Sequence, residues 1–218
     1  MNEQKDFITI RVLFSKTGLA RYISHLDLNR AMTRAMRRAE IPLWYTEGFN
    51  RHAYLTFASP LSLGSESLCE RMDIRLCEPM EPQELCDRLN AVMPQGLQIL
   101  SAAPAVHKAG DLGFARYRLG LPYPRDRVEA FLAQETMPVQ KKSKKGGFKT
   151  VDVRPALKDV QLSDEGEGTS VEVTLPCGGA DTVGPALVVA ALHEFTGDDA
   201  DVSITRLELY TLSGDVFT

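Results

Sequence analysis

The chain has 218 residues, of which 44% are hydrophobic and 25% charged, a composition typical of a soluble globular protein of one large or two small domains. No apolar run approaches the roughly 20 residues that span a bilayer, and polar residues 1–6 are unlike a signal peptide, so we expect a cytoplasmic protein without membrane contact. Residues 1–60 hold nine Lys/Arg against five Asp/Glu, whereas the remainder holds sixteen against twenty-four. A basic segment in an acidic chain fits anion or nucleic-acid binding, and equally a solvated surface.

The four cysteines are not spaced as a metal clip or a redox pair. A radical-SAM cluster needs three thiolates in a C-x3-C-x2-C run, and the sequence has no such run. It also has no Walker loop, dinucleotide fingerprint or H-E-x-x-H zinc motif. We therefore expect no metal and no cofactor, and interpret all four thiols as buried and inert: Cys69, Cys77, Cys86 and Cys177.

Hydrophobic periodicity in the first hundred residues predicts alternating strands and helices. The first helix has an apolar stripe at Leu28, Met32, Ala35, Met36 and Ala39. In chain order we predict a strand over 7–15, a helix over 24–39, strands over 43–46, 54–58 and 70–77, a helix over 82–93 and a strand over 97–101. This β-α-β-β-α-β order is that of a ferredoxin-like unit.

The second half repeats the order more faintly. The predicted elements are a strand over 116–121, a helix over 125–134, a hairpin over 138–153, a strand over 169–175, a helix over 184–195 and a strand over 202–210, with an acidic loop at 164–168. We therefore predict an α+β fold of two tandem ferredoxin-like (βαββαβ) units, residues 1–105 and 114–218. Each would have an antiparallel sheet with helices on one face, and Pro and Gly mark a linker at 104–113.

The first candidate site is a row of arginines on the polar face of the first helix. Arg30, Arg34 and Arg37 fall at i, i+4 and i+7, with Arg21 upstream and Arg38 beside them. Planar guanidinium groups suit phosphate oxygens. The same spacing is also typical of a solvated helix face that binds nothing.

His25 and Asp27 stand at the start of the same helix. They fit an acid/base or phosphate-contacting pair. They fit equally a capping box, in which Ser24 is the N-cap and Asp27 reaches back to its amide.

The second candidate is the loop over 47–53, where Asn50, Arg51 and His52 present hydrogen-bond donors. Nearby aromatic residues fit either base stacking or core packing: Phe49, Tyr54 and Phe57. His25 and His52 would form a general acid/base pair for RNA cleavage only if the fold brings them together.

The third candidate is the lysine-rich hairpin over 141–149. Lys144 and Lys145 precede a Gly-Gly turn and could clamp a phosphate backbone. Basic hairpins also protect sheet edges from pairing.

These motifs together resemble a bacterial radical-SAM-associated family of unknown function. Residues 16–67, 149–155 and 206–210 carry the resemblance, most specifically I-S-H-L-D (23–27) and G-F-N-x-H (48–52). The family usually reads G-F-N-P-H-P, whereas Arg51 and Ala53 replace both prolines here, which makes the loop less rigid. The resemblance implies a radical-SAM protein as partner. The family's motif positions correspond to Ser24, His25, Asp27, Arg30, Arg34, Gly48, Phe49, Asn50, His52, Asp152, Arg154, Arg206 and Tyr210.

A fold-level analogy also exists with the CRISPR repeat-associated RNA-processing endoribonucleases, although the glycine-rich loop near their C-terminus is missing. Three hypotheses follow. The leading one is a nucleic-acid-binding, RNA-directed accessory protein that works with a radical-SAM partner, with anion contacts from the arginine row, Asn50, Arg51, the hairpin lysines and Arg154. The alternatives are a metal-independent endoribonuclease that uses His25 and His52, and a protein-binding adaptor without nucleic-acid contact.

Overall fold

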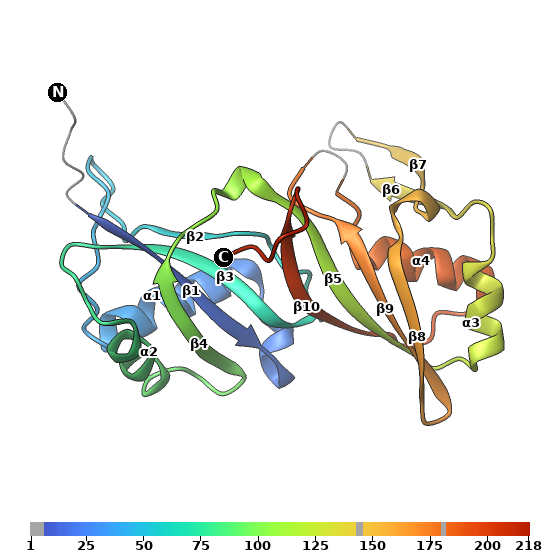
Figure 1. Cartoon of the computed structure of the whole chain (residues 1–218), viewed down its shortest axis with the longest axis horizontal. Coiled ribbons are helices and arrows are strands. Elements are labelled where there is room, and N and C mark those ends of the chain that lie inside the picture. The colour runs from blue at the N-terminus through green and yellow to red at the C-terminus, as the bar shows by residue number, and fades with distance from the viewer. Residues whose placement is uncertain (1–6, 143–145, 180–181) are drawn as a thin grey trace. The chain divides into compact units, whose positions relative to one another are not determined.

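The computed structural model describes residues 7–142, 146–179 and 182–218 (Figure 1). The chain divides into two compact units. Unit 1 runs to Asp111 and includes Phe217–Thr218, and unit 2 comprises Leu112–Val216. The division falls inside the predicted linker. Both units contain helices and antiparallel strands, which confirms the α+β class.

Unit 1 contains a small antiparallel sheet and two α-helices. In the sheet, β1 lies between β4 and β3, and β2 pairs with β3 at the register Leu55↔Ile74. The elements in chain order are β1 (Ile8–Lys16), the 3-10 helix η1 (Gly18–Tyr22), α1 (His25–Arg38), β2 (Leu55–Phe57), β3 (Glu66–Leu76), α2 (Pro82–Asn90), β4 (Leu97–Pro104) and the 3-10 helix η2 (Ala109–Asp111).

The core of unit 1 follows from strand alternation. Successive side chains of a strand point to opposite faces, so Met72, Ile74 and Leu76 of β3 face one way and are completely buried. The helices complete this core with residues of one face each, which belong to the same cluster: Met32 and Met36 of α1, and Leu85 and Leu89 of α2. The intervening residues of β3, including Asp73 and Arg75, therefore lie on the face of the sheet away from the core.

The sequence predicted most of unit 1 correctly, with exceptions where contacts are non-local. The predicted helix over 24–39 is α1 with its two caps. The predicted strand over 43–46 is wrong, because only isolated bridges form there, Leu43↔Leu76 and Tyr45↔Ala53. Strand β3 begins four residues earlier than predicted, and η1 was not predicted at all.

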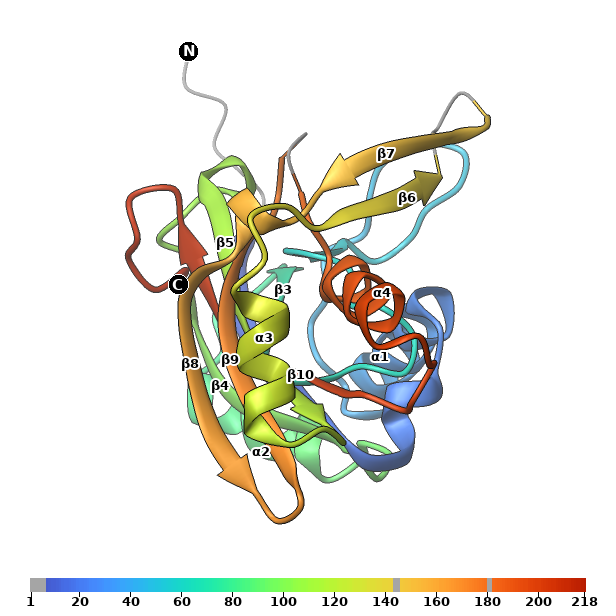
Figure 2. The same ribbon diagram turned by 90° about the vertical axis from the view of Figure 1, so that its right-hand side faces the viewer.

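Four strands of unit 2 pair antiparallel in the order β10-β5-β9-β8. A separate hairpin, β6–β7, lies next to α4 (Figure 2). The elements are β5 (Leu112–Leu121), α3 (Arg125–Leu132), β6 (Pro138–Lys142), β7 (Phe148–Asp152), the 3-10 helix η3 (Arg154–Ala156), β8 (Lys158–Glu165), β9 (Gly168–Pro176), α4 (Pro185–Thr196) and β10 (Ser203–Thr211).

Strand β8 corrects the sequence prediction for unit 2. Residues 164–168 were expected to form a loop, but Asp164 and Glu165 belong to β8 and pair with Thr169 and Gly168 of β9. The predicted hairpin over 138–153 is confirmed as β6–β7.

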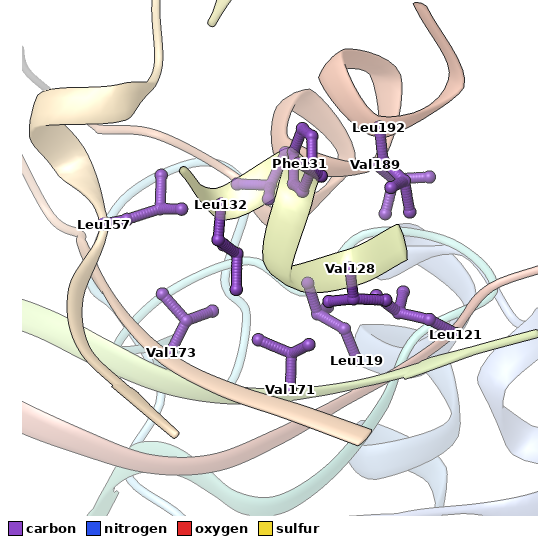
Figure 3. Close-up of a pocket in the computed structure, with 11 residues that line it drawn as sticks. Leu119, Leu121, Val128, Phe131, Leu132, Leu157, Val171, Val173, Val189 and Leu192 are labelled. Carbon is purple, nitrogen blue, oxygen red and sulfur yellow. The ribbon is translucent and has the colours of Figure 1, made fainter. Parts of the chain in front are cut away.

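The core of unit 2 lies between helices α3 and α4 and one face of the strands, where apolar side chains of both meet (Figure 3). Val128 and Phe131 of α3 and Leu192 of α4 are buried against apolar strand residues. The strand residues that line the same interior include Leu119, Leu121, Val171 and Val173. No helix in the described part of the chain is long and apolar enough to cross a membrane.

Candidate anion-binding site

The start of α1 is fixed by contacts between Ser24 and Asp27. Ser24 is the N-cap, and its Oγ accepts the Asp27 N–H at 3.1 Å and donates to Asp27 Oδ2 at 2.7 Å. The other carboxylate oxygen accepts from Arg30 at 3.2 Å. The pKa of Asp27 is lowered because the Ser24 hydroxyl, and then Arg30, hydrogen bond to its charged form. The predicted N-cap therefore exists. The Asp27 carboxylate, which was predicted to accept the Ser24 amide, instead binds Ser24 Oγ and Arg30.

Further along the same helix, three arginines surround a shallow depression. Arg34, Arg37 and Arg38 line it together with Ala31 and Pro94, and its volume is about 420 Å³. Their side chains are exposed because Met32, Ala35 and Met36 take the buried positions of this helix. The helical period therefore separates the apolar and cationic faces, and α1 forms one wall of a cationic depression.

The charges of this depression are not neutralised by carboxylates. Arg38 donates to the Val92 carbonyl at 2.9 Å, whereas Arg34 and Arg37 make no hydrogen bond or ion pair with any residue that the structure describes. Like charges three or four residues apart on a helix destabilise it by a few tenths of a kcal/mol per pair. The negative end of the helix dipole offsets part of this free-energy cost, because Arg37 and Arg38 lie in the last turn of α1. A bound oxyanion would relieve the repulsion.

The G-F-N-R-H loop is closed at its base by His52. The Thr46 N–H donates to the His52 carbonyl at 2.9 Å, and the His52 N–H donates to Thr46 Oγ1 at 3.2 Å. His52 Nδ1 lies 3.1 Å from both Thr46 Oγ1 and the Asn50 carbonyl. Phe49, Asn50 and Arg51 are exposed beyond this closure. His52 thus shapes the loop, and its neighbours present their side chains to solvent.

No hydrogen bond or ring contact joins His25 and His52 in the described part of the chain. The His25 ring lies edge-on to Phe57, with 5.1 Å between ring centroids. His52 precedes Phe57 by five residues, which is on the order of 16 Å in an extended chain. The two imidazoles thus have separate partners, and the acid/base pair on which the cleavage hypothesis depends stays a prediction.

Several other predicted cations have structural partners. Arg21 stacks on Tyr22 at 4.8 Å and approaches Glu66 to 3.8 Å, and Arg30 is held by Asp27. In unit 2, Arg154 Nε donates to the Gln134 carbonyl at 3.1 Å. Each of these arginines thus contacts a partner within its own unit, and the depression on α1 holds the members of the predicted row that pair with no carboxylate among the described residues.

The base of the β6–β7 hairpin is joined by Asp152. Its Oδ1 accepts the N–H groups of Met137 at 2.7 Å and Arg154 at 3.0 Å. Lys141 donates to the Thr182 carbonyl at 3.1 Å. Lys144 and Lys145 lie outside the described residues.

Sequence reasoning missed Arg75, which lies among three aromatic rings on the face of β3 away from the core. Its guanidinium carbon is 3.9 Å from the ring centroid of Phe7, 5.2 Å from Trp44 and 3.8 Å from Tyr54. The sequence shows Arg75 only as a polar position in an alternating strand. The rings come from three separate segments, so no local pattern could identify the cluster.

The cysteines also differ from expectation at one position. Cys69, Cys86 and Cys177 are buried free thiols, but Cys77 is exposed and donates to the Leu43 carbonyl at 3.4 Å. The expectation of a buried thiol is wrong at Cys77 because β3 ends at Leu76, just before it. Burial raises the pKa of the Cys86 thiol.

Comparison with known proteins gives a family without an assigned activity. No curated protein matches the chain in sequence. A family described as "uncharacterized protein conserved in bacteria (DUF2344)" matches residues 9–185. This range extends from β1 to the start of α4 and includes α1, the G-F-N-R-H loop and β3. The chain therefore belongs to this conserved bacterial family.

Proposed function

We propose that this protein binds RNA through the cationic depression on α1. The observation that carries the proposal is the grouping of Arg34, Arg37 and Arg38 around one open depression without a carboxylate among its lining residues. Guanidinium forks bind phosphate oxygens with two parallel hydrogen bonds, and phosphate contacts supply most of the affinity of non-specific nucleic-acid binding.

The two units are, on this proposal, ferredoxin-like repeats. Numbered within each unit, the strands of unit 1 follow the order 4-1-3-2, and those of unit 2 follow it as well if the β6–β7 hairpin is treated as an insertion. The element order βαββαβ is also the same in both. This agreement supports the tandem arrangement that the sequence predicts.

The radical-SAM partner and the cytoplasmic location remain parts of the proposal that rest on the sequence. The I-S-H-L-D and G-F-N-x-H motifs support the partner through the resemblance described above, and the composition of the chain supports the location. In this account the protein is an accessory that presents RNA to the partner and performs no cleavage itself.

The test is RNA affinity, measured by fluorescence anisotropy of a short labelled RNA at low salt. The double variant R34Q/R37Q removes two unpaired cations, and we expect it to weaken binding on the order of tenfold or more. The matched control R88Q/R125Q removes the same charge from exposed arginines that already pair with Glu84 and Glu129. We expect this control to bind nearly as well as the unmodified protein.

Two results would count against the proposal. One is the absence of RNA binding by the unmodified protein at low salt. The other is an equal loss of affinity in both double variants, because this would show a response to net charge without a site. Preference for DNA over RNA of the same sequence would keep the site and overturn the choice of RNA.

A further inference from the structure

The aromatic cluster around Arg75 packs three rings against one guanidinium. Phe7 and Tyr54 lie 3.9 Å and 3.8 Å from its central carbon, and Trp44 lies at 5.2 Å. Main-chain hydrogen bonds fix these rings, because the Trp44 N–H donates to the Arg75 carbonyl at 2.8 Å and the Tyr54 N–H donates to the Trp44 carbonyl at 3.3 Å. The fork is therefore preorganised, and little side-chain freedom remains to be lost when it binds a ligand.

Among the described residues, the same guanidinium has no counter-ion. The neighbouring carboxylate on β3, Asp73, is occupied by Arg11, which donates to both of its oxygens at 2.7 Å and 2.9 Å. Arg75 Nε is buried and has no hydrogen-bond partner among the residues that the structure describes. Within the described part of the chain, no ion pair or hydrogen bond reaches the Arg75 side chain. A half-buried cation with unused donors is costly unless something binds it.

The geometry restricts what can bind. Three rings already pack against the guanidinium, which leaves little of its surface for a further aromatic group such as a nucleobase to stack on. The remaining approach is in the plane of the fork, where paired N–H donors match the oxygens of a phosphate. The positive charge favours an anion over a neutral base edge.

We propose that Arg75 is a phosphate-binding site, with the phosphate held in the plane of a guanidinium against which Phe7 and Tyr54 pack. The site lies at the base of the G-F-N-R-H loop, since Trp44 and Tyr54 flank the segment that Thr46 and His52 close. It is separate from the depression on α1, because Arg75 points away from the core that α1 covers. The phosphate is that of a free mononucleotide or of an RNA chain.

The single tryptophan of the chain is part of the cluster, which provides a local probe. Trp44 fluorescence is titrated with inorganic phosphate, with adenosine 5′-monophosphate, with adenosine, and with sodium chloride at matched ionic strength. We expect a saturable change with the two phosphate compounds and none with adenosine or chloride. A response to adenosine, or no response to inorganic phosphate, would overturn the proposal in the unmodified protein, without any variant.

The variant R75K keeps the charge but loses the planar fork. We expect it to raise the dissociation constant for phosphate roughly tenfold or more, whereas R34Q/R37Q should leave the Trp44 response unchanged. The opposite pattern would contradict the assignment to Arg75. Because RNA binding at α1 and phosphate binding at Arg75 are measured with different probes, either proposal can fail while the other stands.

The source of the phosphate is decided by RNA oligonucleotides of the same sequence. If a 5′-phosphorylated RNA changes Trp44 fluorescence and its 5′-hydroxyl counterpart does not, the site takes a terminal phosphate. If both act alike, it takes the backbone. If neither acts while the mononucleotide does, the ligand is a free nucleotide.

Discussion

At the start of α1, His25 and Asp27 fit two interpretations, an acid/base or phosphate-contacting pair and a capping box. The cap is present, and its N-cap residue is Ser24. Its hydroxyl accepts the Asp27 N–H and donates to the Asp27 carboxylate, so the polar cluster at the start of α1 is engaged in capping. We expect Ser24→Ala to lower the free energy of unfolding by about 1 kcal/mol, the usual cost of losing an N-cap. Urea unfolding followed by circular dichroism measures this. Ser24→Thr, whose hydroxyl can still accept the Asp27 N–H and donate to the Asp27 carboxylate, is the control. An unchanged midpoint in Ser24→Ala would show that the cap contributes nothing.

Glu172 gives unit 2 a defined pH dependence. Arg118 hydrogen bonds to one of its oxygens at 2.8 Å and Arg116 to the other at 2.9 Å, and these contacts lower its pKa. Stability from a lowered carboxyl pKa is complete above the unfolded value of about 4.3 and is lost as the pH falls through the folded value. We expect Glu172→Gln to destabilise the protein at pH 7 and progressively less below pH 4. A difference between the two proteins that stays constant over this range would contradict the pairing.

The sequence predicted the N-cap at Ser24 but not the aromatic cluster around Arg75, for a physical reason. Capping acts over three or four residues, so the run from Ser24 to Asp27 contains its own signal. The environment of Arg75 depends on Phe7, Trp44 and Tyr54, which meet only when the sheet has formed.

At the scale of elements, helix α1 contributes both to the core of unit 1 and to the proposed RNA-binding site. One face packs Met36, which is completely buried, and the other presents the arginines. We expect Met36→Ala to cost about 2–5 kcal/mol of unfolding free energy, as for other buried large-to-small changes. Arg34→Ala on the exposed face should change stability by less than about 0.5 kcal/mol. Denaturant unfolding of both variants checks this, and equal effects would mean that the two faces are assigned wrongly.

The elements that the sequence predicted are stabilised by local contacts, whereas those that it did not predict depend on pairing with other segments. The bounds of α1 were predictable because its apolar stripe and its cap are local. Strand β8 was missed because its side chains are mostly exposed, with Val160 and Leu162 only half-buried, and its pairing with β9 defines it. The prediction of a strand over 43–46 was wrong for a related reason. Leu43 forms an isolated bridge with Leu76 and Tyr45 with Ala53, so no continuous pairing forms there.

At the scale of the whole molecule, the chain returns to unit 1 at its last two residues. Phe217 is completely buried, Arg11 lies 4.3 Å above its ring, and His107 stacks on it at 5.8 Å. The Thr218 N–H donates to His107 Nδ1 at 3.0 Å, and Arg11 donates to the Thr218 carbonyl at 2.9 Å. The sequence did not predict this closure, because it joins residues about a hundred or more positions apart.

We expect Phe217→Ala to destabilise unit 1 by about 3–5 kcal/mol. Trp44 lies in unit 1, so its fluorescence follows the unfolding of that unit directly. Val216→Ala, at a neighbouring and partly exposed position, is the control. An unchanged Trp44 transition in Phe217→Ala would show that the C-terminal residues are dispensable for unit 1.

The measurement that most directly tests RNA binding at α1 is the salt dependence of affinity. For single-stranded RNA, the logarithm of the binding constant falls with the logarithm of salt concentration with a slope of about −0.7 per phosphate contact. If Arg34 and Arg37 each contact one phosphate, R34Q/R37Q should show a slope shallower by about 1.4, while R88Q/R125Q keeps that of the unmodified protein. A slope that does not change in R34Q/R37Q would contradict the account.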